Sequence, residues 1–177
     1  MQKAVLYSFA ATLAGLVSGG LLGLAGHFVP LTVRIAAASL LGLVAITVAL
    51  LELNGRPIRP LQCNRETPQN WVHKGPTRWA IQNGLALGCG ATNRIGFWLW
   101  YAVPTGAFLF ASPWAGAAIY GVYSTTRGMA VWAIILGLAR RRENWDEWLL
   151  KRKETARIVA AAQLLFLGIA VVIAVGL

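Results

Sequence analysis

The chain is poor in charged residues, acids, cysteine and histidine, and these absences exclude most kinds of catalytic site. Among its 177 residues, charged side chains make up 12%, with six aspartates and glutamates, two cysteines and two histidines. Two cysteines are too few for a disulfide framework, and no Cys/His spacing matches a zinc site. No Ser–His–Asp set, glycine-rich phosphate loop or pair of carboxylates can be assembled. We therefore expect no cofactor and no metal, and we favour a protein that is not an enzyme.

Long apolar runs are abundant instead. Hydrophobic residues make up 57% of the chain, and a run of about twenty apolar residues is long enough to cross a bilayer as a helix. Five segments predict an all-α, polytopic membrane protein with a single transmembrane domain: 4–29, 35–53, 79–108, 113–138 and 158–177. The first segment lacks the cleavage site of a secretory signal, and its glycine ladder suits helix packing, so we expect it to stay in the bundle.

The net charge of +10 is concentrated in two of the predicted connections. Residues 54–78 and 139–157 carry most of the lysines and arginines, whereas the other two connections carry only Arg34. Basic loops are retained on the cytoplasmic side, so both loops and the N-terminus are predicted in the cytoplasm, with the C-terminus outside. This distribution orients a membrane protein, and we expect a lipid bilayer and no nucleic acid as partner.

The second basic loop reads RRRENWDEWLLKRKE, and its aromatic residues follow a helical period. Trp145, Trp148 and Leu149 predict a short amphipathic helix on the membrane surface. Basic residues beside it would attract anionic lipid: Arg140, Arg141, Arg142 and Lys151. The alternative is a docking helix for a partner subunit.

Two arginines, Arg94 and Arg127, fall inside predicted spans, where a charge is costly and usually marks a site or a partner. At about 1.5 Å per residue, Arg94 lies roughly 22 Å from the cytoplasmic end of its span and Arg127 roughly 16 Å from that of the next. Consecutive antiparallel spans are usually neighbours, so we expect both guanidinium groups to reach one cavity. Glu52 would reach either of them only if the helices tilt.

Three hypotheses account for two cations at this depth. An anionic ligand lies between them, since arginine binds carboxylate, phosphate or sulfate well. Alternatively, a partner chain supplies acids, or a phospholipid supplies its head group. In the third hypothesis each arginine reaches the interface or backbone carbonyls and serves structure only.

Glycines and small polar residues near the arginines predict a polar cavity. Gly88, Gly90 and Gly96 surround Thr92 and Asn93 and predict an interrupted helix, which a membrane tolerates only where protein or a water-filled cavity satisfies the freed backbone groups. In the next span, Tyr123 and Ser124 precede Arg127 on a polar face. The candidate ligand or partner site is therefore Thr92, Asn93, Arg94, Tyr123, Ser124 and Arg127.

The two cysteines are predicted in different places, Cys63 in a cytoplasmic loop and Cys89 in a span, which argues against a bridge between them. We interpret both as structural thiols, and they remain the candidates for any thiol chemistry.

The stretch GLALGCGATNRIGFWLWYAVPTGAF resembles the fourth helix of the DsbD and CcdA transmembrane electron carriers, which carries a pattern like G-W-T-P-C-I-G-P. Residues 90–97, GATNRIGF, keep Gly, Thr, Ile and Gly of that pattern. The stretch VRIAAASLLGLVAITVALLEL is similar to the family's third helix, and the remaining spans correspond to its second and last two helices. The resemblance implies a multi-pass protein of the prokaryotic cytoplasmic (inner) membrane.

Departures from the family's pattern change the implied function. The family conducts electrons through two membrane cysteines, and Arg94 occupies the position of the fourth-helix cysteine, with Asn93 in place of the preceding proline. The family's first helix, which carries the other cysteine, is missing. Thiol–disulfide electron transfer is then not the expected activity, and the cavity left open favours a homodimer or a filling subunit.

The leading functional hypothesis is a non-redox membrane subunit that anchors or stabilises a larger complex. The alternative is a permease for a small anion, such as a sulfur oxyanion or a carboxylate, that uses Arg94 and Arg127. A membrane thiol-redox protein is the third hypothesis. The motifs GHFVP and GATN also resemble two motifs of membrane glycerol-phosphate acyltransferases, but their order is reversed and the glycine–lysine loop is absent.

Overall fold

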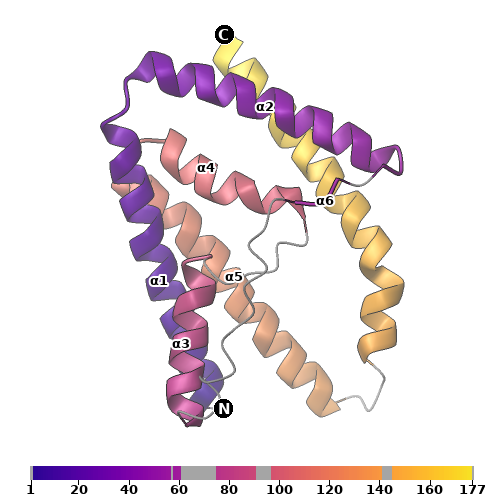
Figure 1. Ribbon diagram of the computed structural model, residues 1–177. Coiled ribbons are helices and arrows are strands. Elements are labelled where there is room, and N and C mark those ends of the chain that lie inside the picture. Colours follow the sequence, from indigo (N-terminus) through magenta and orange to yellow (C-terminus); the bar gives the residue numbers. More distant parts are fainter. Residues whose placement is uncertain (1, 57, 61–74, 91–96, 141–144, 177) are drawn as a thin grey trace. The chain divides into compact units, whose positions relative to one another are not determined.

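The computed structural model describes residues 2–56, 58–60, 75–90, 97–140 and 145–176, and every regular element in this part is helical (Figure 1). The predicted all-α class is therefore confirmed for the described residues. Three helices are long and apolar enough to cross a membrane: Gln2–His27, Leu31–Leu53, and the stretch Arg152–Gly176 of the last helix. These three support a membrane protein, and the count of five spans and their orientation stay predictions.

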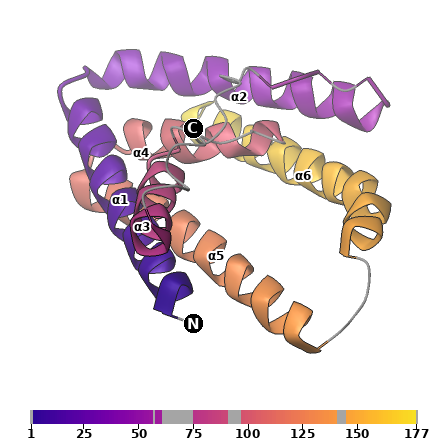
Figure 2. The same ribbon diagram turned by 60° about the horizontal axis from the view of Figure 1, so that its bottom comes forward.

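The chain divides into two compact units, and the first comprises residues 1–28, 62–94 and 106–143. Its helices are α1 (Gln2–His27), α3 (Pro76–Gly88) and α5 (Pro113–Arg140). Both α3 and α5 pack against α1, as Figures 1 and 2 show. Unit 1 is thus organised around the N-terminal helix.

Glycines set the distance between α1 and α5. A Cβ added at Gly19 would collide with the Gly116 carbonyl, and a Cβ added at Gly116 would collide with the Gly19 carbonyl. Gly23 meets the Ser112 carbonyl in the same way. Small residues at this spacing let helix backbones touch, which drives association where lipid removes the hydrophobic effect between helices. The predicted packing role of the glycine ladder is confirmed.

Glycines also allow α3 to pack closely against α1. A Cβ at Gly84 would lie 2.5 Å from the Tyr7 carbonyl and 3.0 Å from the Ala10 Cβ, and one at Gly88 would lie 2.8 Å from the Ala14 Cβ. Alanines therefore form the α1 surface that receives α3, while glycines form the surface that receives α5.

The second unit comprises residues 29–61, 95–105 and 144–177. It contains α2 (Leu31–Leu53), the 3-10 helix η2 (Trp98–Tyr101) and α6 (Trp145–Gly176), and the boundary between the units falls inside α4 (Ala102–Leu109). Its core is Val48, Ala49 and Leu164, with Trp98 and Leu99 of η2 among the residues packed against them. The Trp98 indole N–H donates to the Ile58 carbonyl at 2.9 Å, which ties η2 to the chain beyond α2.

The predicted span 79–108 is not one helix. Helix α3 ends at Gly88, Gly90 has a φ of +72°, and the next helix that the structure describes begins at Trp98. Glycine adopts that left-handed conformation without the strain of a Cβ. At about 1.5 Å per residue, the 13 residues of α3 span roughly 20 Å, less than the roughly 30 Å hydrocarbon core. The interruption that the glycines predict is therefore present, and Thr92, Asn93 and Arg94 lie outside the described residues.

Helix α6 differs from the sequence-based prediction. It runs without a break from Trp145 to Gly176, so the helix expected at Trp145, Trp148 and Leu149 is present but continues into the span expected from 158 instead of ending before it. Lysine, arginine and glutamate are good helix formers, so a change from polar to apolar composition does not end a helix. The basic segment is instead the first turns of the last helix, while Arg141 and Arg142 lie outside the described residues.

Candidate functional site

The candidate site lies where α5 carries polar residues toward α1 in unit 1. Tyr120, Tyr123, Ser124 and Arg127 follow one another at intervals of three, one and three residues, so they share one face of α5. Tyr120 and Ser124 are buried, with 2% and 1% of their surface exposed, and Arg127 is partly buried. Of the predicted site residues, the structure therefore brings Tyr123, Ser124 and Arg127 together.

The Arg127 guanidinium is held by its own helix. Its Nη1–H donates to the Tyr123 hydroxyl at 2.7 Å, and its Cζ lies 5.6 Å from the centroid of the same ring. A hydrogen bond and a cation–π contact from one tyrosine satisfy part of the charge without a carboxylate. Within the described part of the chain no acid pairs with Arg127, as the sequence predicts.

Two more tyrosines lie close to this pair. Tyr7 of α1 is near enough to interact electrostatically with both Arg127 and Tyr123. The Tyr120 and Tyr123 rings meet edge to face at a centroid distance of 6.3 Å. The cation is thus placed among phenol hydroxyls and ring faces, which an anion can join but which offer no general base at neutral pH.

Hydroxyl contacts link α1 and α5 near Arg127. The Trp132 indole N–H donates to the Ser8 Oγ at 3.2 Å, and the Oγ1 atoms of Thr12 and Thr125 lie 3.3 Å apart. We define Tyr7, Ser8, Thr12, Tyr123, Ser124, Thr125, Arg127 and Trp132 as the polar seam of unit 1. Hydrogen bonds between helices of this kind act as polar glue inside a membrane.

Ser124 is the residue of the polar seam that packs against Gly15 of α1. Its Oγ is buried and finds no hydrogen-bond partner among the described residues. It faces Gly15, where an added Cβ would collide with Ser124 Oγ. The absent side chain of Gly15 therefore makes the room in which the serine hydroxyl sits.

Of the two predicted thiols, only Cys89 lies in the part of the chain that the structure describes. Cys89 caps the C-terminus of α3, is exposed, and lies close enough to Tyr120 to interact with it electrostatically. Cys63 lies outside the described residues. The expected absence of a bridge between them stays a prediction.

Several predicted site residues lie outside the described part of the chain or have side chains that are not described. Thr92, Asn93 and Arg94 belong to the first group, so a cavity shared by Arg94 and Arg127 stays a prediction. The backbones of Arg140, Trp145, Trp148 and Lys151 lie in α5 and α6, and their side chains are not described. Anionic lipid binding by this basic segment is therefore also a prediction.

The structure adds residues that the sequence analysis does not single out. Tyr7, Ser8 and Thr12 are polar residues within one and a half turns of the mainly apolar helix α1, and that clustering is the signal that points to them. Trp132 has no such signal, because tryptophan is common near membrane interfaces.

Glu52 belongs to a second charged cluster, in unit 2. It is buried at 6% exposure near the end of α2, and the cation that acts on it is Arg157 of α6. Arg157 Nη2 also pairs with Glu154 Oε2 at 2.8 Å, one helical turn earlier. From the sequence we expect Glu52 to reach Arg94 or Arg127 only if the helices tilt, whereas in the structure the cation that acts on it is Arg157.

No group of three or more His, Cys, Asp or Glu side chains that would suit a metal ion occurs among the described residues. Comparisons with protein families, curated proteins and solved structures find no match to this chain.

Proposed function

We propose that the chain is a membrane-integral subunit that anchors or stabilises a larger membrane complex without catalysing a reaction. The observation that carries the proposal is how little of its apolar surface each of the two units covers by itself. In the most apolar window of α1, α2 and α6, the share of buried residues is 28%, 28% and 22%. Glycine and alanine fill the helix contacts, so large side chains such as Phe9, Val122 and Phe166 are left on the outside at 68%, 68% and 77% exposure.

The proposal includes five spans in a prokaryotic cytoplasmic membrane, with the N-terminus inside, and descent from DsbD-like carriers that lost their redox pair. Helix α3 is 13 residues long and ends at Gly88, two residues before the stretch 90–97 that carries the resemblance. A helix that ends inside the bilayer exposes carbonyl groups that must find partners. A neighbouring subunit that supplies them gives the chain a structural role.

The test is purification of the tagged chain from its native membrane in a mild detergent, followed by mass measurement of the intact particle. A subunit yields a particle of defined stoichiometry that contains at least one other membrane protein. A monomer that carries neither protein nor lipid would contradict the proposal.

A small-anion permease is the second candidate, and the specific observation in its favour is the environment of Arg127. A guanidinium held by Tyr123, with Tyr7 nearby and no described carboxylate as partner, keeps its charge available to an anion. Liposome uptake of sulfite, sulfate and small carboxylates tests this candidate. Uptake that survives an Arg94→Ala, Arg127→Ala double variant would exclude this candidate. An Arg127→Lys variant is the control that keeps the positive charge and removes only the guanidinium group.

A further inference from the structure

A glutamine on α3 carries a buried oxygen that has no partner. Gln82 Oε1 is buried and accepts no hydrogen bond from any of the described residues. An amide oxygen is an acceptor that cannot change its charge to make burial easier. Burial of such an acceptor without a donor is costly, and native structures usually supply the donor from protein, water or a bound group. A donor is therefore expected beside Gln82.

The spacing along α3 and α5 relates Gln82 to Arg127. Cys89, at the end of α3, has helical φ and ψ of −71° and −13° and lies close enough to Tyr120 of α5 to interact with it electrostatically. Gln82 precedes Cys89 by seven residues, about two helical turns, so the two share a face of α3. Arg127 follows Tyr120 by seven residues on α5. Each step covers roughly 10 Å along its helix.

The two steps lead to the same level of unit 1 because α3 and α5 are antiparallel. As α1 runs from Tyr7 to Ala14, its contacts on α3 ascend from Gly84 to Gly88. As α1 continues from Gly15 to Gly23, its contacts on α5 descend from Ser124 to Ser112. A step back along α3 and a step forward along α5 therefore run in the same direction, beside the same helix α1.

Tyr7 of α1 gives an independent check of this register. Its backbone carbonyl faces Gly84, two residues beyond Gln82 on α3. Its phenol is near enough to Arg127 of α5 to interact with it electrostatically. The same residue of α1 thus lies next to the Gln82 turn of α3 and next to Arg127. We call these three residues, Gln82, Tyr7 and Arg127, the three-helix site.

We propose that the three-helix site binds a small oxyanion that keeps one hydroxyl proton, of which hydrogencarbonate is the simplest. A guanidinium group has five N–H donors, and the described residues take one from Arg127, the Nη1–H that bonds to Tyr123. The other donors match the two oxygens that share the negative charge of the anion. The hydroxyl of the anion donates to Gln82 Oε1, and the Tyr7 hydroxyl donates to the anion. An oxyanion without a proton, including a lipid phosphodiester, leaves Gln82 Oε1 without its donor.

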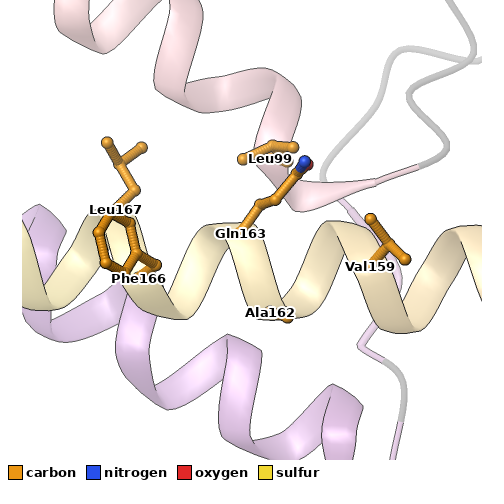
Figure 3. A pocket seen from close by; sticks show the side chains of 6 residues that line it. All are labelled: Leu99, Val159, Ala162, Gln163, Phe166 and Leu167. Atoms are coloured by element: carbon orange, nitrogen blue, oxygen red, sulfur yellow. The ribbon is translucent and has the colours of Figure 1, made fainter.

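A second glutamine offers a matched control. Gln163 of α6 is exposed and extends toward Leu99 in a groove of about 550 Å³ (Figure 3). All other side chains that line this groove are apolar: Leu99, Val159, Ala162, Phe166 and Leu167. Gln163 therefore has no cation beside it in the groove and no buried oxygen that needs a donor. Gln163→Leu is the control for the same change at residue 82.

The test is calorimetric titration of the chain in phosphatidylcholine nanodiscs with hydrogencarbonate and with nitrate, at a mildly alkaline pH. Both anions are planar, similar in size and singly charged, but nitrate has no proton to donate. We expect the native chain to bind hydrogencarbonate about tenfold more tightly than nitrate, the effect of one hydrogen bond to a buried acceptor. Gln82→Leu should lose this preference and keep its affinity for nitrate, whereas Gln163→Leu should behave as the native chain.

Equal affinities of the native chain for the two anions, or no binding of either, would overturn the proposal. Nitrate binding also reports whether a variant keeps its fold, and Gln82→Met is a second chain without the amide oxygen. A preference for hydrogencarbonate that persists in both variants of Gln82 overturns the proposal as well.

This inference deepens the second candidate function, the anion permease, and rests on the same guanidinium. The titration measures binding without transport, so the two ideas fail separately. Binding with the expected preference but without uptake in liposomes would exclude the permease and support the site. Uptake that depends on Arg127, in a chain that does not distinguish the two anions, would retain the permease and overturn the three-helix site.

Discussion

The Arg127 side chain illustrates how a single residue makes a buried charge tolerable in this chain. Tyr123, one turn earlier on α5, supplies both the hydroxyl that accepts the Nη1–H and the ring beneath the guanidinium. The sequence predicts that these residues share a helix face, because three- and four-residue spacing is a property of the helix alone. It does not predict Tyr7 as their neighbour, because nothing in the local periodicity says which helix α5 packs against.

We expect Tyr123→Phe to lower the free energy of unfolding by about 1 to 3 kcal/mol, because it removes the acceptor of a partly buried charged donor and keeps the ring. Unfolding in mixed detergent, followed by circular dichroism, measures the change. Thr126→Val is the matched control, since its hydroxyl bonds only to the Val122 carbonyl of its own helix and is exposed. Equal losses in the two variants would show that the hydroxyl of Tyr123 does not hold the arginine.

At the scale of helices, close contacts between helix backbones hold the structure together. The backbones at Gly19 and Gly116 each occupy the space that the other's Cβ would need, whereas Gly84 and Gly88 of α3 pack against backbone and alanine atoms of α1. The glycine spacing predicts close packing and the break near Gly90, because both follow from the absent Cβ. The continuity of α6 is not predicted, because polarity was used to place its start, and helix formation there depends on propensity rather than on polarity.

A comparison of Gly19→Ala with Gly20→Ala tests this packing with two neighbouring glycines of one helix. The methyl group at residue 19 meets the Gly116 carbonyl, and overpacking of that kind costs about 1 to 3 kcal/mol. The methyl group at residue 20 finds its nearest atom at 3.7 Å, so we expect no loss of stability. Thermal aggregation of the purified variants in detergent reports the difference, and equal stabilities would argue against a glycine-driven contact of α1 with α5.

For the whole molecule, composition and charge asymmetry predict the membrane class, and three apolar helices support it. The helix contacts do not reveal on which side of the membrane each connection lies, because positive residues set the orientation during insertion. Single cysteines at two exposed positions decide it, in the background without Cys63 and Cys89. We expect a membrane-impermeant maleimide added to intact cells to label Phe110→Cys and to spare Arg56→Cys until the cells are opened. The reverse pattern would invert the proposed topology.

Helices that pair in the folded protein are synthesised far apart in time. Trp132, the partner of Ser8, lies 124 residues later in the chain. Gly42 of α2 and Gly168 of α6, which meet in unit 2, are likewise 126 residues apart. At about 5 to 20 residues per second, the ribosome takes roughly 6 to 25 s to make the partner of Ser8. During that interval α1 resides in the bilayer with its hydroxyls and bare glycine backbone facing lipid or the insertion machinery. We therefore expect the chain to be more open to proteolysis during its synthesis than after α1 has paired with α5.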